Sequence, residues 1–588
     1  MSRLQTIYEQ NMREQDSNPW DIYPRPLMQR ESFISLNGTW QLFLLEARKK
    51  GRTLCRSERL VGDIRVPFPP ESPISGIEQT LKKGQHWIYR KSIISPRLQE
   101  GEKLILHFGA VDQVCHVRLN GCPVGGHEGG YLPFEMDLTA ALKEGENLLE
   151  VEAEDDHLPE YGLGKQSLKR GGMWYTAHSG IWQSVWMEVL PENGFRSVET
   201  YADGAHVTVR VTGAKGMKKL TIDGQTYAFS GESLSVHLEK PHWWTTEDPY
   251  LYRFSLENKT DKVESYFALR TVDIRRISVS DAEAGGTGRQ EQAYICLNGK
   301  PIFLHGLLDQ GYYPDGIVLP ASPKAYGDDI AAMKRLGFNF LRKHIKIEPQ
   351  VFYYECDRQG MLVMQDLVNS GRYFFLADTV LPTLGLQRLI THRATMERKA
   401  RFEADAGKTL ELVKGHPSVF SVTIFNEGWG QYDTDRLYKK LKEEAPEMIF
   451  DSASGWFKGH LTDVASDHVY FKRVRMQRTP KKPMLLSEYG GYALQTPGHV
   501  FNEDKVYGYK RFGTGEELQE GLEKLFEADV IPAIRRGLNG AVLTQLSDVE
   551  DETNGMLTYD RKVLKVDEDR MQKAAQRLQE VFRETVGC

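Results

Sequence analysis

Between residues 33 and 192 the hydrophobic positions come in short runs that turn residues interrupt. Runs such as 103–109, 147–155 and 181–190 either alternate apolar with polar residues or are apolar throughout, and Asn120-Gly121 suits a tight hairpin turn. Strands of this length and spacing predict a β-sandwich of about 160 residues. A second strand-like stretch, residues 193–275, has the length of an immunoglobulin-like sandwich.

After residue 300 strand-like runs alternate with helical ones. Eight apolar runs lie between residues 301 and 548, and most are separated by segments with a helical pattern or by long loops. Eight is the number of strands in a (β/α)8 barrel, and about 290 residues fits that fold. A doubly wound open sheet is the alternative, but no glycine-rich GxGxxG sequence follows a first strand.

Composition narrows the class of protein. The 588 residues are too many for one core, and 40% hydrophobic and 27% charged residues are ordinary for a globular chain. A formal charge of −6 argues against nucleic acid or an anionic membrane as the main partner. The first residues contain no apolar leader, no run reaches the length of a membrane span, and six scattered cysteines form no CxxC pair. We therefore expect free thiols and a cytoplasmic location.

Two carboxylates end predicted barrel strands. Glu427 follows the fourth run and Glu488 the seventh, and each is followed by glycine and aromatic residues. The carboxyl ends of the strands of such a barrel carry its active site. We therefore treat the polar and aromatic residues at the strand ends as candidate site residues: Arg342, His344, Asp366, Asn426, Trp429, Trp456, His468, Tyr470, Gln545 and Asp548.

A pair of carboxylates suits glycoside hydrolysis. One group protonates the leaving oxygen and the other meets the anomeric carbon, and a separation of about 5 to 5.5 Å indicates a nucleophile and a retained configuration. We expect Trp429 and the apolar strand to disfavour the charged form of Glu427, and Tyr470 or Arg342 to keep Glu488 ionised. No HExxH-like spacing predicts a metal, and neither GxSxG nor a P-loop occurs. Taken singly, either glutamate could be an ordinary loop residue.

Four segments carry a resemblance to a known family: "FNEGWG" (425–430), "LLSEYGGY" (485–492) and, before them, "SGIWQSVWMEV" and "LNGKPIFLHGLLDQGYYPDG". With these segments the chain resembles glycoside hydrolase family 2. That family comprises retaining β-glycosidases, among them β-galactosidases, β-glucuronidases and β-mannosidases. The resemblance implies a jelly-roll sugar-binding domain (1–192), an immunoglobulin-like β-sandwich (193–275) and a catalytic (β/α)8 TIM barrel (276–588). It also implies Glu427 as general acid/base, Glu488 as nucleophile and Asn426 as a partner of the sugar 2-hydroxyl.

Departures from the family pattern bear on the sugar. His344 stands one position early in the usual Arg-x-x-His-x-Pro, Asp366 follows Gln365 where Asp-Glu is common, and Leu543 replaces a tryptophan. Gln545 and Asp548 then become candidate contacts. The Asn-x-Lys-Gly element of β-glucuronidases is missing, although Lys343, Lys346 or Arg372 could receive a uronic acid differently.

The sequence thus favours an exo-acting β-galactosidase-type enzyme that needs no cofactor and forms a homo-oligomer. The alternatives are β-glucuronidase or β-galacturonidase, β-mannosidase and arabinosidase specificity. A non-catalytic carbohydrate-binding protein is also conceivable, but it would be expected to have lost one carboxylate.

Two further features concern the shape of the site. Residues 158–180 are polar, glycine-rich and long for a sandwich loop, and we expect them to reach towards the barrel mouth and help to choose the substrate. An ordinary surface or interface loop is the alternative. Trp429 and Trp456 offer flat faces for a sugar or aglycone, or are simply packing aromatics.

Overall fold

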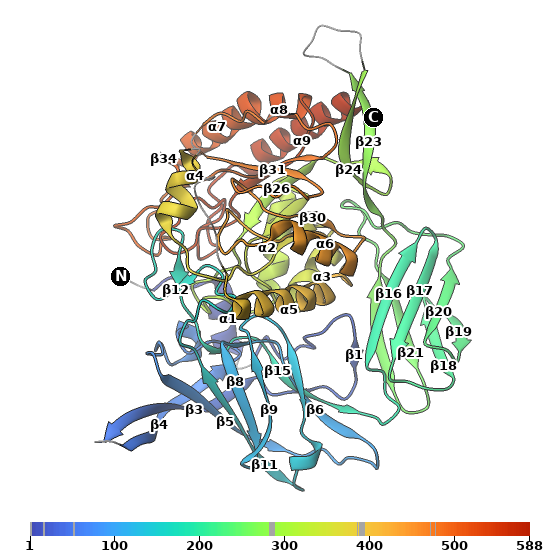
Figure 1. Ribbon diagram of the computed structural model, residues 1–588, viewed down its shortest axis with the longest axis vertical. Helices are drawn as coiled ribbons and strands as arrows, with labels where there is room; N and C mark the ends of the chain where they lie inside the picture. The colour runs from blue at the N-terminus through green and yellow to red at the C-terminus, as the bar shows by residue number, and fades with distance from the viewer. Residues whose placement is uncertain are drawn as a thin grey trace.

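The computed structural model describes residues 3–15, 18–50, 53–280, 289–384, 386, 394–470, 472–476 and 478–587. Figure 1 shows three lobes: a sandwich at the bottom, a smaller sandwich on the right, and a barrel above them with its covering helices. The predicted multidomain architecture of two β-sandwiches and a TIM barrel is confirmed.

The first sandwich consists of a six-stranded and a four-stranded sheet. Its strands alternate as predicted: in β8, Cys115, Val117 and Leu119 are buried while His116 is exposed. The inward side chains form one core around Trp40, Trp87 and their neighbours. The strand order in the six-stranded sheet is β4 (Thr53–Val66), β3 (Gly38–Lys50), β5 (Gln85–Ile94), β11 (Glu146–Glu154), β8 (Val114–Leu119), β9 (Cys122–Glu128). The strand order in the four-stranded sheet is β10 (Phe134–Asp137), β6 (Lys103–Phe108), β15 (Val185–Leu190), β2 (Ile34–Ser35).

The second sandwich packs a three-stranded sheet on a five-stranded one. A strand from the N-terminal segment, β1 (Gln29–Arg30), adds to the edge of the latter by pairing with β22. The sequence predicts that residues 1–192 belong to the first domain. This strand, at residues 29–30, is instead part of the second sandwich. The strand order in the three-stranded sheet is β16 (Ser197–Asp203), β17 (His206–Thr212), β20 (Ser233–His237). The strand order in the five-stranded sheet is β1, β22 (Lys262–Phe267), β21 (Tyr252–Glu257), β18 (Lys218–Ile222), β19 (Gln225–Phe229).

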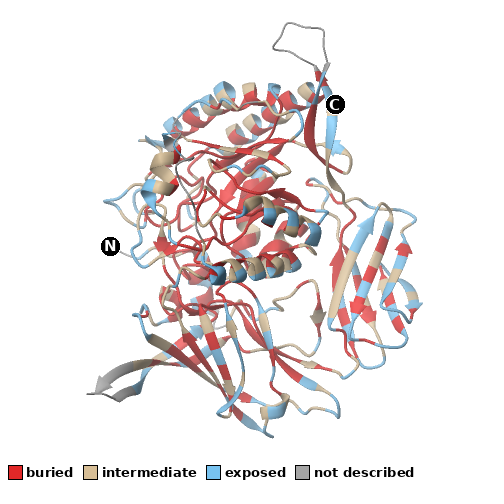
Figure 2. Ribbon diagram, in the orientation of Figure 1, coloured by how far each residue is buried: buried red, intermediate tan, exposed pale blue. Residues whose placement is uncertain are grey.

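All eight predicted apolar runs are strands of one parallel sheet that forms the barrel. Their residues are buried on both faces, whereas the strands of the second sandwich alternate (Figure 2), and burial on both faces is the reason for their continuous apolar runs. Phe340, Met364 and Leu485 are among the side chains of the barrel interior. The order is β30 (Ile449–Asp451), β29 (Val419–Thr423), β28 (Leu362–Asp366), β27 (Phe340–Lys343), β26 (Leu304–Asp309), β35 (Leu538–Thr544), β32 (Met484–Gly490), β31 (Ala465–Val469).

Helices and short elements complete the chain. The barrel is joined to the second sandwich through β23 (Val272–Ser280), β24 (Arg289–Leu297) and β25 (Lys300–Pro301). The helices are α1 (Ile7–Gln15), α2 (Lys324–Arg335), α3 (Gln350–Gln359), α4 (Leu381–Thr383), α5 (Met396–Val413), α6 (Thr434–Glu444), α7 (Gly515–Leu525), α8 (Ile531–Arg535), α9 (Glu568–Val586), with single turns at Pro73–Ser75, Thr139–Ala141, Leu376–Val380 and Phe526–Val530. Short strands are β7 (Val111–Asp112), β12 (Gln166–Ser167), β13 (Tyr175–Thr176), β14 (Gly180–Ile181), β33 (Tyr492–Leu494) and β34 (Lys510–Phe512).

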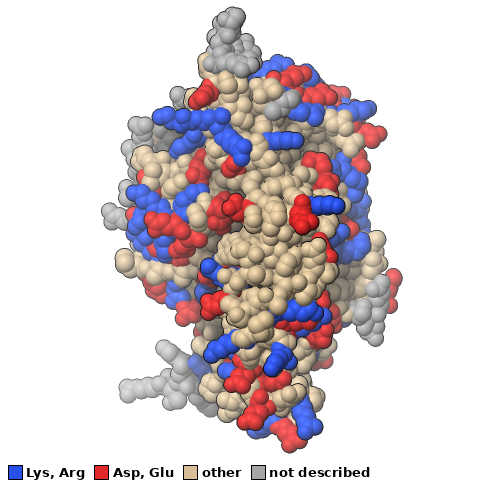
Figure 3. Space-filling view, turned by 90° about the vertical axis from the view of Figure 1, so that its right-hand side faces the viewer, with Lys and Arg blue, Asp and Glu red and all other residues tan. Residues whose placement is uncertain are grey.

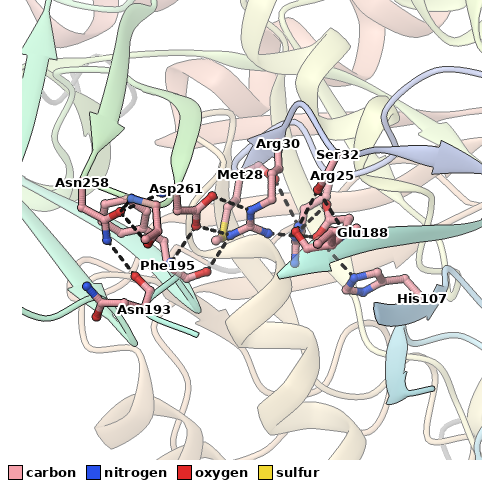
Figure 4. A network of polar contacts seen from close by, with 12 residues as sticks. Arg25, Met28, Arg30, Ser32, His107, Glu188, Asn193, Phe195, Asn258 and Asp261 are labelled. Carbon is pink, nitrogen blue, oxygen red and sulfur yellow. Dashed lines mark hydrogen bonds and ion pairs between the residues drawn. The ribbon is translucent and has the colours of Figure 1, made fainter. Parts of the chain in front are cut away.

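The N-terminal segment fastens the lobes to one another. Tyr8, Met12 and Trp20 pack into the barrel's outer core, and the indole of Trp20 donates to the carbonyl of Pro320 at 3.0 Å. Further along, the buried guanidinium of Arg30 lies between the two sandwiches (Figure 4). It donates to Glu188 of the first sandwich at 3.0 Å and to Asp261 of the second at 2.9 Å.

Surface and redox features are unremarkable for this architecture. On the face shown in Figure 3, basic and acidic side chains intermingle, as the near-balanced composition predicts. Cys115, Cys122 and Cys356 are free thiols, as expected, and the sulfur of Cys296 donates to the carbonyl of Tyr294 at 3.7 Å. The side chains of Cys55 and Cys588 fall outside the described part. Among the described residues, no helix has both the length and the apolar character that a membrane span requires.

Replacing Arg30 should loosen the sandwiches. In Arg30→Met, Asp261 stays buried without its cation and Glu188 keeps only the cation of Arg25, so we expect a loss of about 3 kcal/mol or more. Calorimetry should show the first unfolding transition at lower temperature. Lys324→Met, which removes the exposed Lys324–Asp328 pair, is the matched control and should cost less than about 1 kcal/mol. Equal shifts in the two variants would contradict the role of Arg30.

Candidate active site

Arg342, in β27, is the centre of the polar groups at the carboxyl end of the barrel. Its side chain is completely buried. Nε donates to Asp366 at 2.9 Å and Nη1 to Glu488 at 2.9 Å. Nη2 donates to the amide oxygen of Asn426 and to the hydroxyl of Ser454, both at 2.9 Å. One side chain therefore sets the positions of three sequence-predicted site residues.

Glu488, at the end of β32, is held as an anion. Burial alone would raise the pKa of this carboxyl, but His468, Arg342 and His344 outweigh burial and lower its pKa well below the ordinary range. The phenol of Tyr470 donates a short hydrogen bond to its second oxygen. The expectation that Arg342 and Tyr470 hold Glu488 is thus realised in the geometry.

Glu427 lies on the other side of the same opening. Its backbone has φ of 51°, and its N–H donates to the carbonyl of Ser454 at 3.0 Å, which anchors the turn after β29. Its surroundings differ from the apolar ones expected, because Oε1 lies 2.7 Å from Nδ1 of His468. One carboxylate oxygen of Glu427 and one of Glu488 lie within 4.8 Å of each other, with a ring nitrogen of His468 at the same range.

Asp366 supports the arginine from the neighbouring strand β28, and His344, which directly follows β27, supports Asp366 in turn. Nδ1 of His344 lies 2.8 Å from Asp366 and 4.0 Å from Glu488. Burial raises the pKa of Asp366, but Arg342 and His344 lower it more, so the carboxyl stays ionised. Burial lowers the pKa of His344, which favours the neutral ring. Asp366 thus balances the charge of Arg342 beside the two glutamates.

The predicted aromatic residues have different environments. Trp429 is buried: its indole donates to the carbonyl of Gly371 at 2.9 Å, and its ring packs edge-on against Trp174 at 5.0 Å. Trp456 is half-buried, with its ring centroid 6.3 Å from that of His468. Tyr470 stacks on Tyr509 with centroids 3.9 Å apart. Because it is only half-buried, Trp456 is better placed than Trp429 to stack on a ligand, whereas Trp429 packs inside the protein.

Gln545 and Asp548 lie in the loop after β35 rather than against the glutamates. The amide of Gln545 donates to Asn554 at 2.8 Å. Asp548 accepts from Lys565 at 2.7 Å, and burial raises its pKa to about 6 although Lys565 opposes the rise. Asp548 thus braces the loop, and the structure does not bring it into contact with Glu427 or Glu488.

The basic pocket considered for a uronic acid is not built from Lys343 and Lys346. Both side chains are completely buried on the outside of the mouth. Lys343 pairs with Asp309 at 2.8 Å and with Glu348 at 2.6 Å, and Lys346 pairs with Glu348 at 2.7 Å. Their charges are already neutralised, which corrects that expectation. Arg372 is exposed at the rim.

The loop 158–180 does reach the barrel mouth. Gly162 bridges to Ser370, and the N–H of Leu163 donates to the carbonyl of Asn369 at 3.0 Å. Trp174 contacts both Trp429 and Tyr373, each with ring centroids 5.0 Å apart. A loop of the first sandwich therefore packs against the segments after β28 and β29, at the end of the barrel where the two glutamates lie.

Family models match the chain in two places. Residues 74–169 match the glycosyl hydrolase 2 galactose-binding domain-like model, and residues 289–579 match the glycosyl hydrolases family 2 TIM barrel domain. The chain belongs to glycoside hydrolase family 2. The family-2 barrel model covers β26 to β35, and therefore every residue of the Arg342 network.

Relatives and solved structures agree with family 2. A β-galactosidase of Thermoanaerobacter pseudethanolicus is 23% identical over 475 residues, which is 71% of this chain and only 58% of the relative. A β-glucuronidase structure from an uncultured Clostridium has a TM-score of 0.69 at 18% identity, covering 96% of this chain and 99% of that one. A β-galacturonidase structure from Eisenbergiella tayi has a TM-score of 0.65 at 18% identity, covering 94% and 98%. The structural likenesses show the fold.

The sequence placed His468 and Ser454 among the polar residues at strand ends, and His468 among the candidate site residues, but no motif around either gave it a specific role in this family-2 site. His468 lies two positions before Tyr470, and alternate residues of a strand point to one face, so this spacing was the available signal. Ser454 had none, because its contacts with Arg342 and Asn426 depend on how neighbouring strands meet.

The ionised state of Glu488 should appear in the acid stability of the protein. Because its folded pKa lies below the ordinary value, its contribution is fully present above about pH 4.5 and is lost as the pH falls towards about 2. In Glu488→Gln we therefore expect a shallower loss of thermal stability between these pH values than in the wild type. Melting temperatures measured across this range test it, and parallel curves would contradict it.

Proposed function

We propose that this chain is a retaining, exo-acting β-glycosidase. The observation that carries the proposal is the pair of carboxylates at the barrel mouth, with oxygens of Glu427 and Glu488 within 4.8 Å. Oxygens this close place the pair with retaining enzymes, whose carboxyl groups lie roughly 5 to 5.5 Å apart, rather than with inverting ones at roughly 6.5 to 9.5 Å. The ionised Glu488 supports its assignment as nucleophile.

The other site residues follow from these two. Glu427 would protonate the departing oxygen and then activate the water that releases the glycosyl-enzyme. Asn426 has its amide oxygen occupied by Arg342 and Ser454, so its NH2 group is the one available to the sugar 2-hydroxyl. No step requires a cofactor.

The loop 158–180 supports an exo-acting enzyme. Its contacts with residues 369–373 and with Trp429 close one side of the opening. A closed side leaves room for the end of a glycan or a glycoside more readily than for the middle of a chain. A homo-oligomer and a cytoplasmic location stay predictions of the sequence.

Two glycones are candidates. The sequence favours a neutral β-galactoside, and the relatives carry names of both β-galactosidases and uronidases. One observation favours a β-uronoside: Lys165, in the loop 158–180, is 7% exposed and has no ion pair or hydrogen bond of its ammonium group to any described residue. Its ammonium lies over the ring of Trp174 at 5.7 Å. Burial lowers the pKa of His344 and the charge of Lys165 adds to that effect, whereas burial raises the pKa of Glu552 and the charge of Lys165 opposes the rise. A carboxylate on the sugar would supply the missing partner.

A substrate screen tests the reaction class. Purified protein should hydrolyse one of 4-nitrophenyl β-galactoside, β-galacturonide, β-glucuronide, β-glucoside, β-mannoside or α-L-arabinoside, with the anomeric configuration of the first product retained. Glu488→Ala should lose at least about 10⁴-fold in kcat. In Glu427→Ala, added azide should restore turnover and yield the β-glycosyl azide. A first product of inverted configuration would overturn the proposal, and binding without turnover would favour a carbohydrate-binding protein.

Lys165 tests the choice of sugar. Because a charge-assisted hydrogen bond contributes about 1.5 to 3 kcal/mol, Lys165→Gln should lower kcat/KM on the uronoside by about 10- to 100-fold and leave the galactoside nearly unchanged. Lys169→Gln, an exposed lysine of the same loop, is the matched control and should change neither. Equal losses on both sugars would remove the case for an acidic glycone.

A further inference from the structure

His468, near the end of β31, occupies the space between the two catalytic carboxylates. Its side chain has no exposed surface. Nδ1 lies 2.7 Å from Oε1 of Glu427, and Nε2 lies 3.6 Å from Oε1 of Glu488. The two ring nitrogens therefore face two different carboxylates, one on each side of the ring.

The proposed reaction moves one negative charge between these carboxylates. As Glu488 bonds to the anomeric carbon, the glycosidic C–O bond breaks, its electron pair stays on the leaving oxygen, and that oxygen takes the proton of Glu427. Glu488 thereby becomes a neutral ester and Glu427 an anion. Hydrolysis reverses the exchange: Glu427 takes a proton from water, the water oxygen bonds to the anomeric carbon, and the ester electron pair returns to Glu488.

We infer that His468 is the shared counter-charge for this alternating anion, a positioning residue that acts through Glu427 and Glu488. Its ring faces the negative charge on Glu488 before the glycosyl transfer and on Glu427 after it. The inference rests on the proposed function for its catalytic consequence, but the contact between the three side chains stands independently of it.

The charged groups around the ring support this role. Glu427 follows β29, Glu488 ends β32 and Asp451 ends β30, while Arg342 of β27 approaches Nε2 at 3.2 Å. Burial and Arg342 lower the pKa of His468, but Glu488 and Glu427 raise it more, so the protonated ring is favoured overall. Arg342 keeps its other acceptors, Glu488 and Ser487, whichever state the ring takes.

Leaving-group dependence separates this role from a structural one. In His468→Asn, kcat/KM for a 4-methylumbelliferyl glycoside should fall by about 10²-fold, because the anion that forms on Glu427 has lost its partner. A 2,4-dinitrophenyl glycoside needs no proton from Glu427, so it should lose less than about 10-fold. Equal losses on both substrates would overturn the inference.

A matched control is available elsewhere in the barrel. His416 is also completely buried and lies 2.7 Å from the carboxylate of Asp357, away from the glutamates. His416→Asn removes a buried histidine–carboxylate pair of the same kind. We expect it to change both substrates by the same factor, whereas a leaving-group dependence like that of His468→Asn would count against the specific role of His468.

A second measurement needs no turnover. In ¹⁵N-histidine NMR of the full chain, the resonances lost in His468→Asn identify the ring, and its titration midpoint should lie above the ordinary histidine value. In Glu488→Gln the midpoint should fall, because the carboxylate that carries the negative charge in the free enzyme is gone. A midpoint that Glu488→Gln leaves in place would overturn the inference. A chain inactive on every glycoside but with the expected titration would instead overturn the proposed function.

Discussion

The barrel mouth depends on one buried cation. Arg342 stands on β27. Its guanidinium contacts residues in or close after β28, β29, β30, β31 and β32, so six consecutive strands converge on it. A buried guanidinium is tolerated only when its donors are matched and its charge is balanced. Asp366 and Glu488 supply the balance. The same requirement therefore ionises the proposed nucleophile and aligns Asn426.

The sandwiches contribute to the site through their attachment to the barrel. The loop 158–180 can form a wall of the opening only if the first sandwich is held in place. That position is set by the N-terminal segment packed on the barrel and by Arg30, which joins Glu188 and Asp261. A residue of one domain, such as Lys165, can thus lie beside residues of another. On the proposed function, this division would let loops change the glycone while the barrel keeps the chemistry.

Buried lysines illustrate why charge near a site is not enough to assign a ligand. Lys343 and Lys346 neighbour Arg342 in sequence, but strand alternation turns Lys343 away from the interior, where Asp309 and Glu348 neutralise it. Lys165 is far away in sequence, yet it comes close to His344, and its ammonium group has no ion pair among the residues that the structure describes. Pairing, rather than proximity, separates a structural cation from one available to substrate.

By itself the sequence determined the architecture and the two glutamates. Continuous apolar runs mark the barrel strands because both of their faces are buried, and alternating runs mark the sandwiches because one face is not. Strand ends and the motifs around Glu427 and Glu488 then located the opening. Only the tertiary structure decided which other polar residues belong to it. In the structure His468 and Ser454 are part of the site, Asp548 pairs with Lys565, and β1 is an edge strand of the second sandwich. These outcomes depend on which strands and loops meet in space, and a linear pattern of residue types does not encode such pairings.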